Sequence, residues 1–231
     1  MKRISPELVI FDVDGVLVDV RGSFHRTILD TVRFFTHRRV TYAEIAAWKN
    51  RGGYNDDWRL STAWINSLGV KAKYEEVRRQ SNKFYWGEKG RPGNVTRERW
   101  LVPRRRLEKW KRRAELGIFT GRTREELDYT LDRLKLKSYF TRIVTMDDLR
   151  KQKPDPEGLL RLLGKLDPRR AVYLGDNVDD ALSSKRARVP FFGVLPSGGT
   201  PKARRTRTGL LRKLGAIRVL DCVNELEKYW L

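Results

Sequence analysis

The sequence has one cysteine, two histidines and two methionines among its 231 residues. The single Cys222 excludes an intramolecular disulfide and a zinc site built from several cysteines. No apolar run reaches the roughly 18 residues that a membrane span needs. The first residues lead directly into a strand-like segment, so we expect no signal peptide. These absences favour a cytoplasmic globular protein without a membrane segment.

Acidic residues are scarce relative to basic ones. The chain carries 29 Asp and Glu against 50 Lys and Arg, a net charge of +21. Basic residues concentrate in two segments, 91–113 and 202–218. The second segment contains no Asp or Glu. Such a surface attracts anions. Two interpretations stay open: capture of a small phosphorylated metabolite and binding of nucleic acid, although no nucleic-acid motif is visible. The sequence predicts no oligomeric state.

The second half of the chain alternates strand-like apolar runs with segments of helical spacing. Repeated strand–helix units of this kind predict a parallel sheet with helices on both faces. The fold class that we expect is therefore α/β, a Rossmann-like doubly wound sheet. Strands are expected at 8–11, 116–119, 143–145, 171–174, 191–194 and 217–220, and helices at 124–136, 156–166, 179–188 and 223–229.

A helical stretch interrupts this alternation directly after the first strand. Helical patterns occur at 24–35, 42–49, 59–68 and 74–86, with no convincing strand among them. Residues 90–93, Gly-Arg-Pro-Gly, are typical of a linker. We therefore expect a catalytic core of residues 1–21 and 95–231, with an inserted α-helical cap at 22–94.

Two aspartates follow the first expected strand. Asp12 and Asp14 are separated by one residue and come after Leu8-Val-Ile-Phe. Ligands of open α/β sheets bind at the carboxyl ends of the strands, which is where both carboxylates lie. Neighbouring carboxylates repel each other, and a hard cation such as Mg²⁺ between them relieves this repulsion. Aspartate can also act as a nucleophile toward phosphorus.

Three further strand ends carry polar residues. Thr120 and Gly121 follow one strand, and a hydroxyl with a Gly amide can bind a phosphate oxygen. Lys153 precedes a helix, where its charge can neutralise phosphate. Asp176 and Asp180 follow another strand and form a second pair of carboxylates. Because parallel strands bring these ends to one edge, the set predicts a metal-assisted phosphoryl-transfer site.

This ordered set of motifs resembles the haloacid dehalogenase-like (HAD) hydrolase superfamily. The helical insertion after the first motif is similar to that of the phosphoglycolate phosphatase-like branch. The resemblance implies a Mg²⁺-dependent phosphatase that hydrolyses a small phosphomonoester through an aspartyl-phosphate. An acid at position 14 is absent from the family's dehalogenases, so Asp14 favours phosphate chemistry. A phosphosugar mutase keeps both aspartates and stays open, as does a nucleic-acid-end phosphatase or a basic nucleic-acid-binding module.

The resemblance also implies a role for each residue. Asp12 would attack phosphorus, and Asp14 would protonate the leaving oxygen and later deprotonate water. Thr120 and Gly121 would hold the phosphoryl group, and Lys153 would stabilise its charge. The expected metal ligands are Asp12, Asp14 through its carbonyl, Asp176 and, directly or through water, Asp180.

Less specific signals suggest substrate contacts. Asn55 and Asp56 lie in a Gly-containing loop of the expected cap, where they could contact the leaving group, or cap the helix that starts near Trp58. Arg122 could bind a second anionic group of the substrate, or lie exposed beside Glu125 or Glu126.

Overall fold

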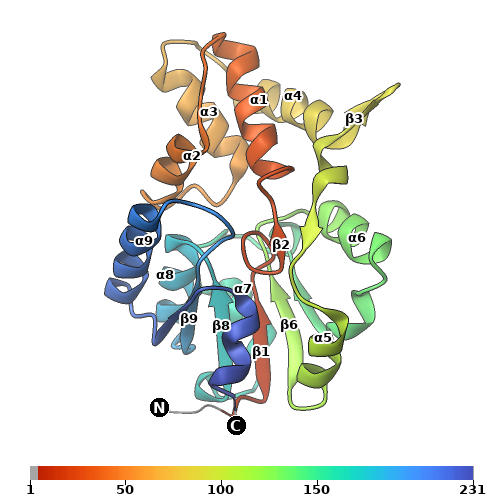
Figure 1. The fold of residues 1–231 in the computed structure, drawn as a ribbon, viewed down its shortest axis with the longest axis vertical. Coiled ribbons are helices and arrows are strands. Elements are labelled where there is room, and N and C mark those ends of the chain that lie inside the picture. Colours follow the sequence, from red (N-terminus) through yellow and green to blue (C-terminus); the bar gives the residue numbers. More distant parts are fainter. Residues whose placement is uncertain (1–4, 231) are drawn as a thin grey trace. The chain divides into compact units, whose positions relative to one another are not determined.

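The computed structural model describes residues 5–230. The chain forms two compact units that divide between Val18 and Asp19 and between Arg99 and Trp100. We call residues 19–99 the helical unit and the rest the core unit. The chain leaves the core through β2 (Val18–Asp19) and returns through β5 (Arg99–Trp100) (Figure 1).

The core unit contains a six-stranded sheet in which all neighbouring strands are parallel. The strand order changes direction at β1, so β1 lies between β8 and β6. A crevice opens at such a point, next to the carboxyl ends of the strands. This confirms the expected α/β class. Across the sheet the strands are β10 (Arg218–Leu220), β9 (Phe191–Val194), β8 (Ala171–Gly175), β1 (Leu8–Phe11), β6 (Glu115–Phe119) and β7 (Arg142–Val144).

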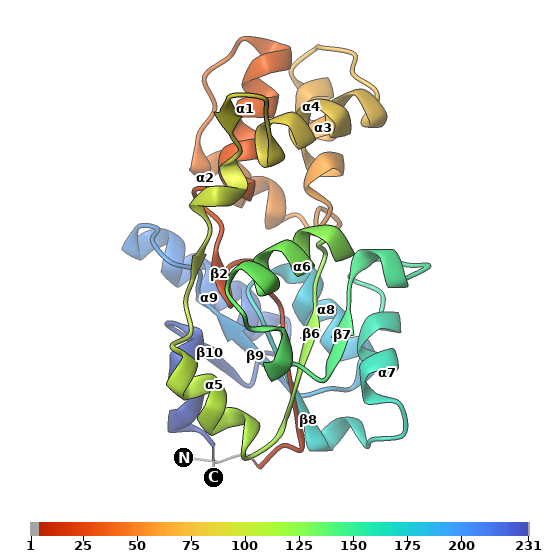
Figure 2. The ribbon, with the colours of Figure 1, turned by 90° about the vertical axis from the view of Figure 1, so that its right-hand side faces the viewer.

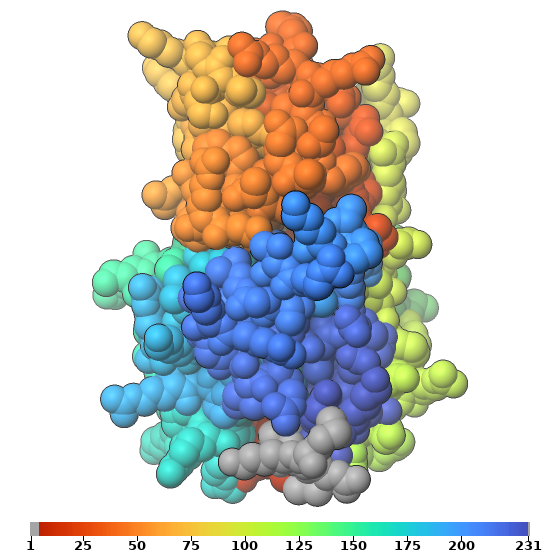
Figure 3. Space-filling view, turned by 60° about the vertical axis from the view of Figure 1, so that its left-hand side comes forward, coloured from red at the N-terminus to blue at the C-terminus, as the bar shows by residue number. Residues whose placement is uncertain are grey.

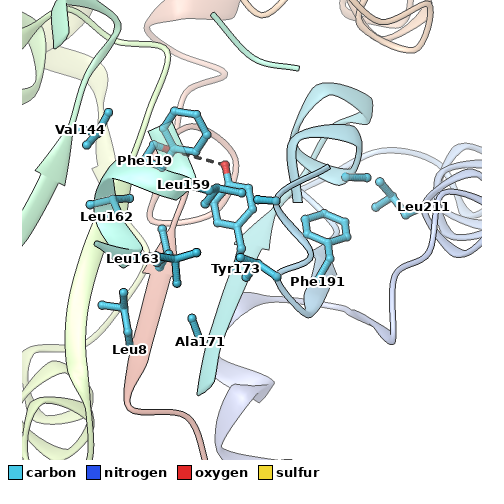
Figure 4. Packing of buried hydrophobic residues seen from close by; sticks show 14 residues of the cluster. Leu8, Phe119, Val144, Leu159, Leu162, Leu163, Ala171, Tyr173, Phe191 and Leu211 are labelled. Atoms are coloured by element: carbon cyan, nitrogen blue, oxygen red, sulfur yellow. Dashed lines mark hydrogen bonds between the residues drawn. The ribbon is translucent and has the colours of Figure 1, made fainter. Parts of the chain in front are cut away.

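Helices cover both faces of this sheet, and Figure 2 shows α5 on one side and α7 on the other. β1 is apolar on both faces. Leu8 and Ile10 join the cluster under α7 and α8, of which Figure 4 labels Leu8. On the other face, Phe11 stacks on Trp110 of α5. A strand buried on both faces forms a continuous apolar run. The helices are α5 (Arg104–Lys111), α6 (Arg124–Arg133), α7 (Glu157–Leu163), α8 (Val178–Ala187) and α9 (Pro201–Lys213).

Several expected boundaries need correction. The helix expected at 156–166 is α7, which begins at Glu157 and ends at Leu163 before Gly164. The closing helix is a 3₁₀ segment, Val223–Lys228. The sequence did not predict α5 or α9, because both are basic runs with few apolar positions. Further 3₁₀ segments are Asn94–Arg97, Lys137–Tyr139, Met146–Asp148 and Pro168–Arg170.

The helical unit has its own apolar core, which includes Ile28, Leu60 and Trp64. Its helices are α1 (Phe24–Thr36), α2 (Tyr42–Lys49), α3 (Asp57–Ser67) and α4 (Tyr74–Trp86). The expectation of no strand is wrong, since β3 (Gly87–Glu88) and β4 (Arg91–Pro92) form a short antiparallel hairpin. Within residues 5–230, no helix has the length and apolar character of a membrane span.

Candidate active site

The first motif continues from β1 into a tight loop. Asp12 is 3% exposed, and its N–H donates to the carbonyl of Leu174 on β8. Gly15 then adopts a φ of +78°. A Cβ at position 15 would lie 2.5 Å from Oδ2 of Asp176, so glycine is needed for both the backbone conformation and the close approach.

Lys153 connects the first and last motifs. Its Nζ donates to Oδ1 of Asp12 at 2.9 Å and to Oδ1 of Asp180 at 2.8 Å. A third bond, at 2.9 Å, goes to the carbonyl of Phe119, the residue before Thr120. The ammonium group is buried, so these three acceptors replace its hydration. Residues 141 positions apart thus meet, as the sequence predicted.

The carboxylate of Asp180 accepts four hydrogen bonds. Oδ1 accepts from Lys153 and, at 2.6 Å, from the hydroxyl of Tyr173. Oδ2 accepts from the N–H groups of Asp176 and Asn177 at 3.0 and 3.1 Å. These bonds occupy about four lone-pair positions of a carboxylate. Asp180 therefore organises the loop that carries Asp176.

Sequence reasoning missed Tyr173. It is a buried tyrosine in the strand Ala-Val-Tyr-Leu-Gly, with its ring in the core beside Phe119 (Figure 4). A hydroxyl inside a strand buried on both faces needs a hydrogen-bond partner, which was the available signal. Burial raises the pKa of Tyr173 well above its ordinary value, and the nearby Asp180 and Asp12 raise it further, so the hydroxyl stays a donor.

Three carboxylates are close enough to share one ion. One oxygen each from Asp12, Asp176 and Asp180 lies within 4.8 Å of the other two. Burial raises the pKa of Asp12 well above its ordinary value. The positive charge of Lys153 opposes this shift, whereas the negative charges of the neighbouring aspartates, Asp180, Asp14 and Asp176, add to it. Burial lowers the pKa of Lys153, but its two carboxylate partners outweigh this and leave the pKa raised. Three carboxyl groups thus lie around one ammonium group.

The second motif lies at the end of β6. Thr120 is buried, and its N–H donates to the carbonyl of Val144. Its Oγ1 accepts the N–H of Arg122 at 3.2 Å. Gly121 is partly exposed. Thr120 also follows Phe119, whose carbonyl binds Lys153, so this motif adjoins the acidic cluster.

Arg122 lies inside the core unit, with 1% of its surface exposed. The expected alternative of an exposed arginine is therefore wrong. Its Nε and one terminal nitrogen contact Oδ1 of Asp14 at 2.8 and 2.7 Å. The other terminal nitrogen donates to Oγ1 of Thr130 at 2.9 Å. Nothing in the sequence pattern signals this pairing across 108 positions.

In the helical unit, the side chain of Asp56 caps α3. Its Oδ1 accepts from the N–H groups of Trp58 and Arg59, and its Oδ2 accepts from the hydroxyl of Tyr74 at 3.0 Å. Asn55 precedes it in the same loop. Of the two interpretations for Asp56, helix capping is the one that the structure shows.

Comparisons with known proteins show the family to which the chain belongs. The sequence model of the family described as haloacid dehalogenase-like hydrolase matches residues 104–194. The pyrophosphatase PpaX of Anoxybacillus flavithermus is 35% identical over 188 residues, which cover 80% of this chain and 82% of that protein. The chain belongs to the haloacid dehalogenase-like hydrolase family.

Two further matches show the range of relatives. An imidazoleglycerol-phosphate dehydratase of Phytophthora nicotianae is 30% identical over 82% of this chain, but the match spans only 43% of that longer protein. The crystal structure of a predicted phosphoglycolate phosphatase from Haemophilus somnus has a TM-score of 0.76 at 18% identity, and the match covers 97% of each chain. The second match shows that this HAD chain has the same fold.

Proposed function

We propose that this chain is a Mg²⁺-dependent phosphatase that hydrolyses a small phosphomonoester. The observation that carries the proposal is the buried ammonium of Lys153 between Asp12 and Asp180, beside Asp176. A buried lysine with two carboxylates fixes a nucleophile where a phosphoryl group can bind. The pyrophosphatase name of a 35% identical relative supports phosphoryl chemistry. From the single cysteine we expect a cytoplasmic location.

The donor set fits a divalent cation. Asp12, Asp176 and the carbonyl of Asp14 would hold Mg²⁺, with Asp180 orienting the loop. The charges of Lys153 and a divalent ion together balance the carboxylates of Asp12, Asp176 and Asp180. When bound, Mg²⁺ supplies charge stabilisation for the phosphoryl oxygens.

In the first step, an oxygen of Asp12 attacks phosphorus. The bond from phosphorus to the ester oxygen breaks, and that oxygen takes a proton from the carboxyl group of Asp14 and leaves as an alcohol. The Thr120 hydroxyl and the Gly121 N–H hold the transferring group, and Lys153 balances its charge.

In the second step, water attacks phosphorus of the aspartyl-phosphate. The carboxylate of Asp14 takes a proton from that water, and the bond between phosphorus and Asp12 breaks. Inorganic phosphate leaves, and Asp14 again carries the proton for the next turnover. Each atom and proton of the cycle is thereby accounted for.

The test is hydrolysis of p-nitrophenyl phosphate with Mg²⁺, with EDTA, and by the Asp12→Asn variant. We expect turnover that requires Mg²⁺ and falls by at least about 10³-fold in the variant, because the nucleophile is lost. A panel of phosphorylated metabolites then identifies the preferred ester. Turnover that Asp12→Asn retains would overturn the proposal, and phosphoryl transfer to a sugar phosphate instead of water would favour the mutase.

A further inference from the structure

The backbone of Arg122 is held by neighbouring segments. Its N–H donates to Oγ1 of Thr120, and its carbonyl accepts the N–H of Met146 at 3.0 Å. The next residue, Thr123, begins α6 with a capping box that includes Glu126. The backbone of Arg122 is therefore fixed by the phosphate-binding motif before it and the helix after it.

The side chain of Arg122 is held as firmly as its backbone. One terminal nitrogen donates to Thr130, whose hydroxyl in turn donates to the carbonyl of Glu126. Thr130 and Asp14 thus contact different nitrogens of one planar guanidinium group, which restrains its orientation. Burial of such a charge is costly unless it is paired, and here Asp14 and Thr130 supply the partners.

Both contacts with Asp14 use the same oxygen. The Nε of Arg122 and one terminal nitrogen lie 2.8 and 2.7 Å from Oδ1. Neither of these two contacts uses the second oxygen, Oδ2. The Asp14 side chain is 26% exposed, whereas that of Arg122 is fully buried, so the pair presents its carboxyl end outward.

We infer that Arg122 is a positioning residue that holds the Asp14 carboxyl group for proton transfer, and that it does not bind the substrate. The inference rests on the proposed phosphatase function. Asp14 Oδ2 gives its proton to the ester oxygen as the bond from that oxygen to phosphorus breaks. Arg122 fixes Oδ1 and thereby the direction in which Oδ2 points.

Leaving-group dependence tests this inference. A nitrophenolate leaves without a proton, whereas phenolate is a poorer leaving group that needs one. We expect Arg122→Met to lower kcat/KM for phenyl phosphate at least about tenfold more than for 2,4-dinitrophenyl phosphate, because kcat/KM reports the step in which the leaving group departs and general acid catalysis contributes roughly 10²–10⁴-fold. Arg122→Lys keeps the positive charge but lacks the planar guanidinium group with its several donors. We expect the same selective loss of activity toward phenyl phosphate, but of smaller magnitude.

A double-mutant cycle separates positioning from a structural role. In an Asp14→Asn background, Arg122→Met should cause no further loss selective for phenyl phosphate. The Mg²⁺-dependent rise in melting temperature should match that of the wild type, which shows that the metal loop is intact. Equal losses on both esters, or a selective loss that persists without Asp14, would overturn the inference.

The proposed function is tested separately in the same assay. Wild-type turnover that Asp12→Asn abolishes supports the phosphatase, whatever the Arg122 variants do. If the wild type hydrolyses neither ester, the proposed function fails and this inference fails with it. Should Arg122→Met be unstable, the result with Arg122→Lys decides.

Discussion

At the scale of single residues, the core unit buries several charged groups. Glu126 is 4% exposed, and burial raises its pKa to about 7, although the N–H of Thr123 and the charge of Arg122 oppose the shift. Asp14 adds to it. Since the raised pKa favours the protonated form in the folded state, the stability associated with Glu126 is complete below about pH 4.5 and is lost as the pH rises through 7.

We therefore predict that Glu126→Gln becomes more stable relative to the wild type as the pH rises. The gain between pH 4.5 and 8 should be on the order of 3 kcal/mol, and glutamine can still serve the capping box. Urea unfolding across this range, in EDTA, measures it. A difference that does not change with pH would contradict the prediction.

The residues also show what sequence can and cannot reveal about the site. Asp12, Lys153, Asp176 and Asp180 were predictable because each follows a strand or precedes a helix, and topology brings these points together. The contacts of Arg122 were not, because they depend on side-chain directions in three dimensions. Its charge favoured an exposed position, and the Asp14 carboxyl group and the buried Thr130 hydroxyl override that preference.

At the scale of elements, the start of α3 depends on one side chain. Asp56 accepts two backbone N–H groups and the Tyr74 hydroxyl. We predict that Asp56→Ala lowers the stability of the chain by about 1–2 kcal/mol, whereas Asp56→Asn, which can still cap, costs less. Thermal unfolding of the two variants measures this.

Kinetics of the same two variants decide the remaining interpretation of Asp56. If this residue only caps α3, KM and kcat of Asp56→Asn should equal those of the wild type. A large rise in KM for the preferred substrate, with stability unchanged, would instead support contact with the leaving group.

Helices were predictable where the apolar spacing is regular. The bounds of α2 and α4 agree with the expected segments, since apolar residues mark the buried face. By contrast, α9 buries only Leu211 fully among its thirteen residues, so its sequence resembles a solvated basic run. The sequence marks only the start of this helix, through the Thr200 N-cap and Pro201 in the first turn. Such a signal covers too few residues to predict a whole helix.

At the scale of the whole molecule, the net charge is +21. Figure 3 shows α9, in blue, at the surface, and its exposed basic residues include Lys202, Arg205 and Arg212. Arg207 of this helix donates to the carbonyl of Asp176, so α9 adjoins the loop of the acidic cluster. A basic helix in this place can raise the local concentration of anions near the site.

We predict that kcat/KM for p-nitrophenyl phosphate falls several-fold as KCl rises from about 20 to 500 mM, while kcat changes little. The double variant Lys202→Glu/Arg205→Glu should lower kcat/KM at low salt and flatten its dependence on salt. A salt-independent kcat/KM would contradict electrostatic capture. Salt-sensitive binding of a random oligonucleotide would favour nucleic acid as the partner of this surface.

The central position of β1 has a consequence for synthesis on the ribosome. Leu8 pairs with Glu115 on one side and with Ala171 on the other. Of the strands in this sheet, β1 is therefore synthesised first, but both of its partner strands are synthesised much later. The helical unit, which has its own apolar core, is completed in the interval. An apolar segment without partners is then exposed in the nascent chain, at risk of wrong pairing until β8 emerges.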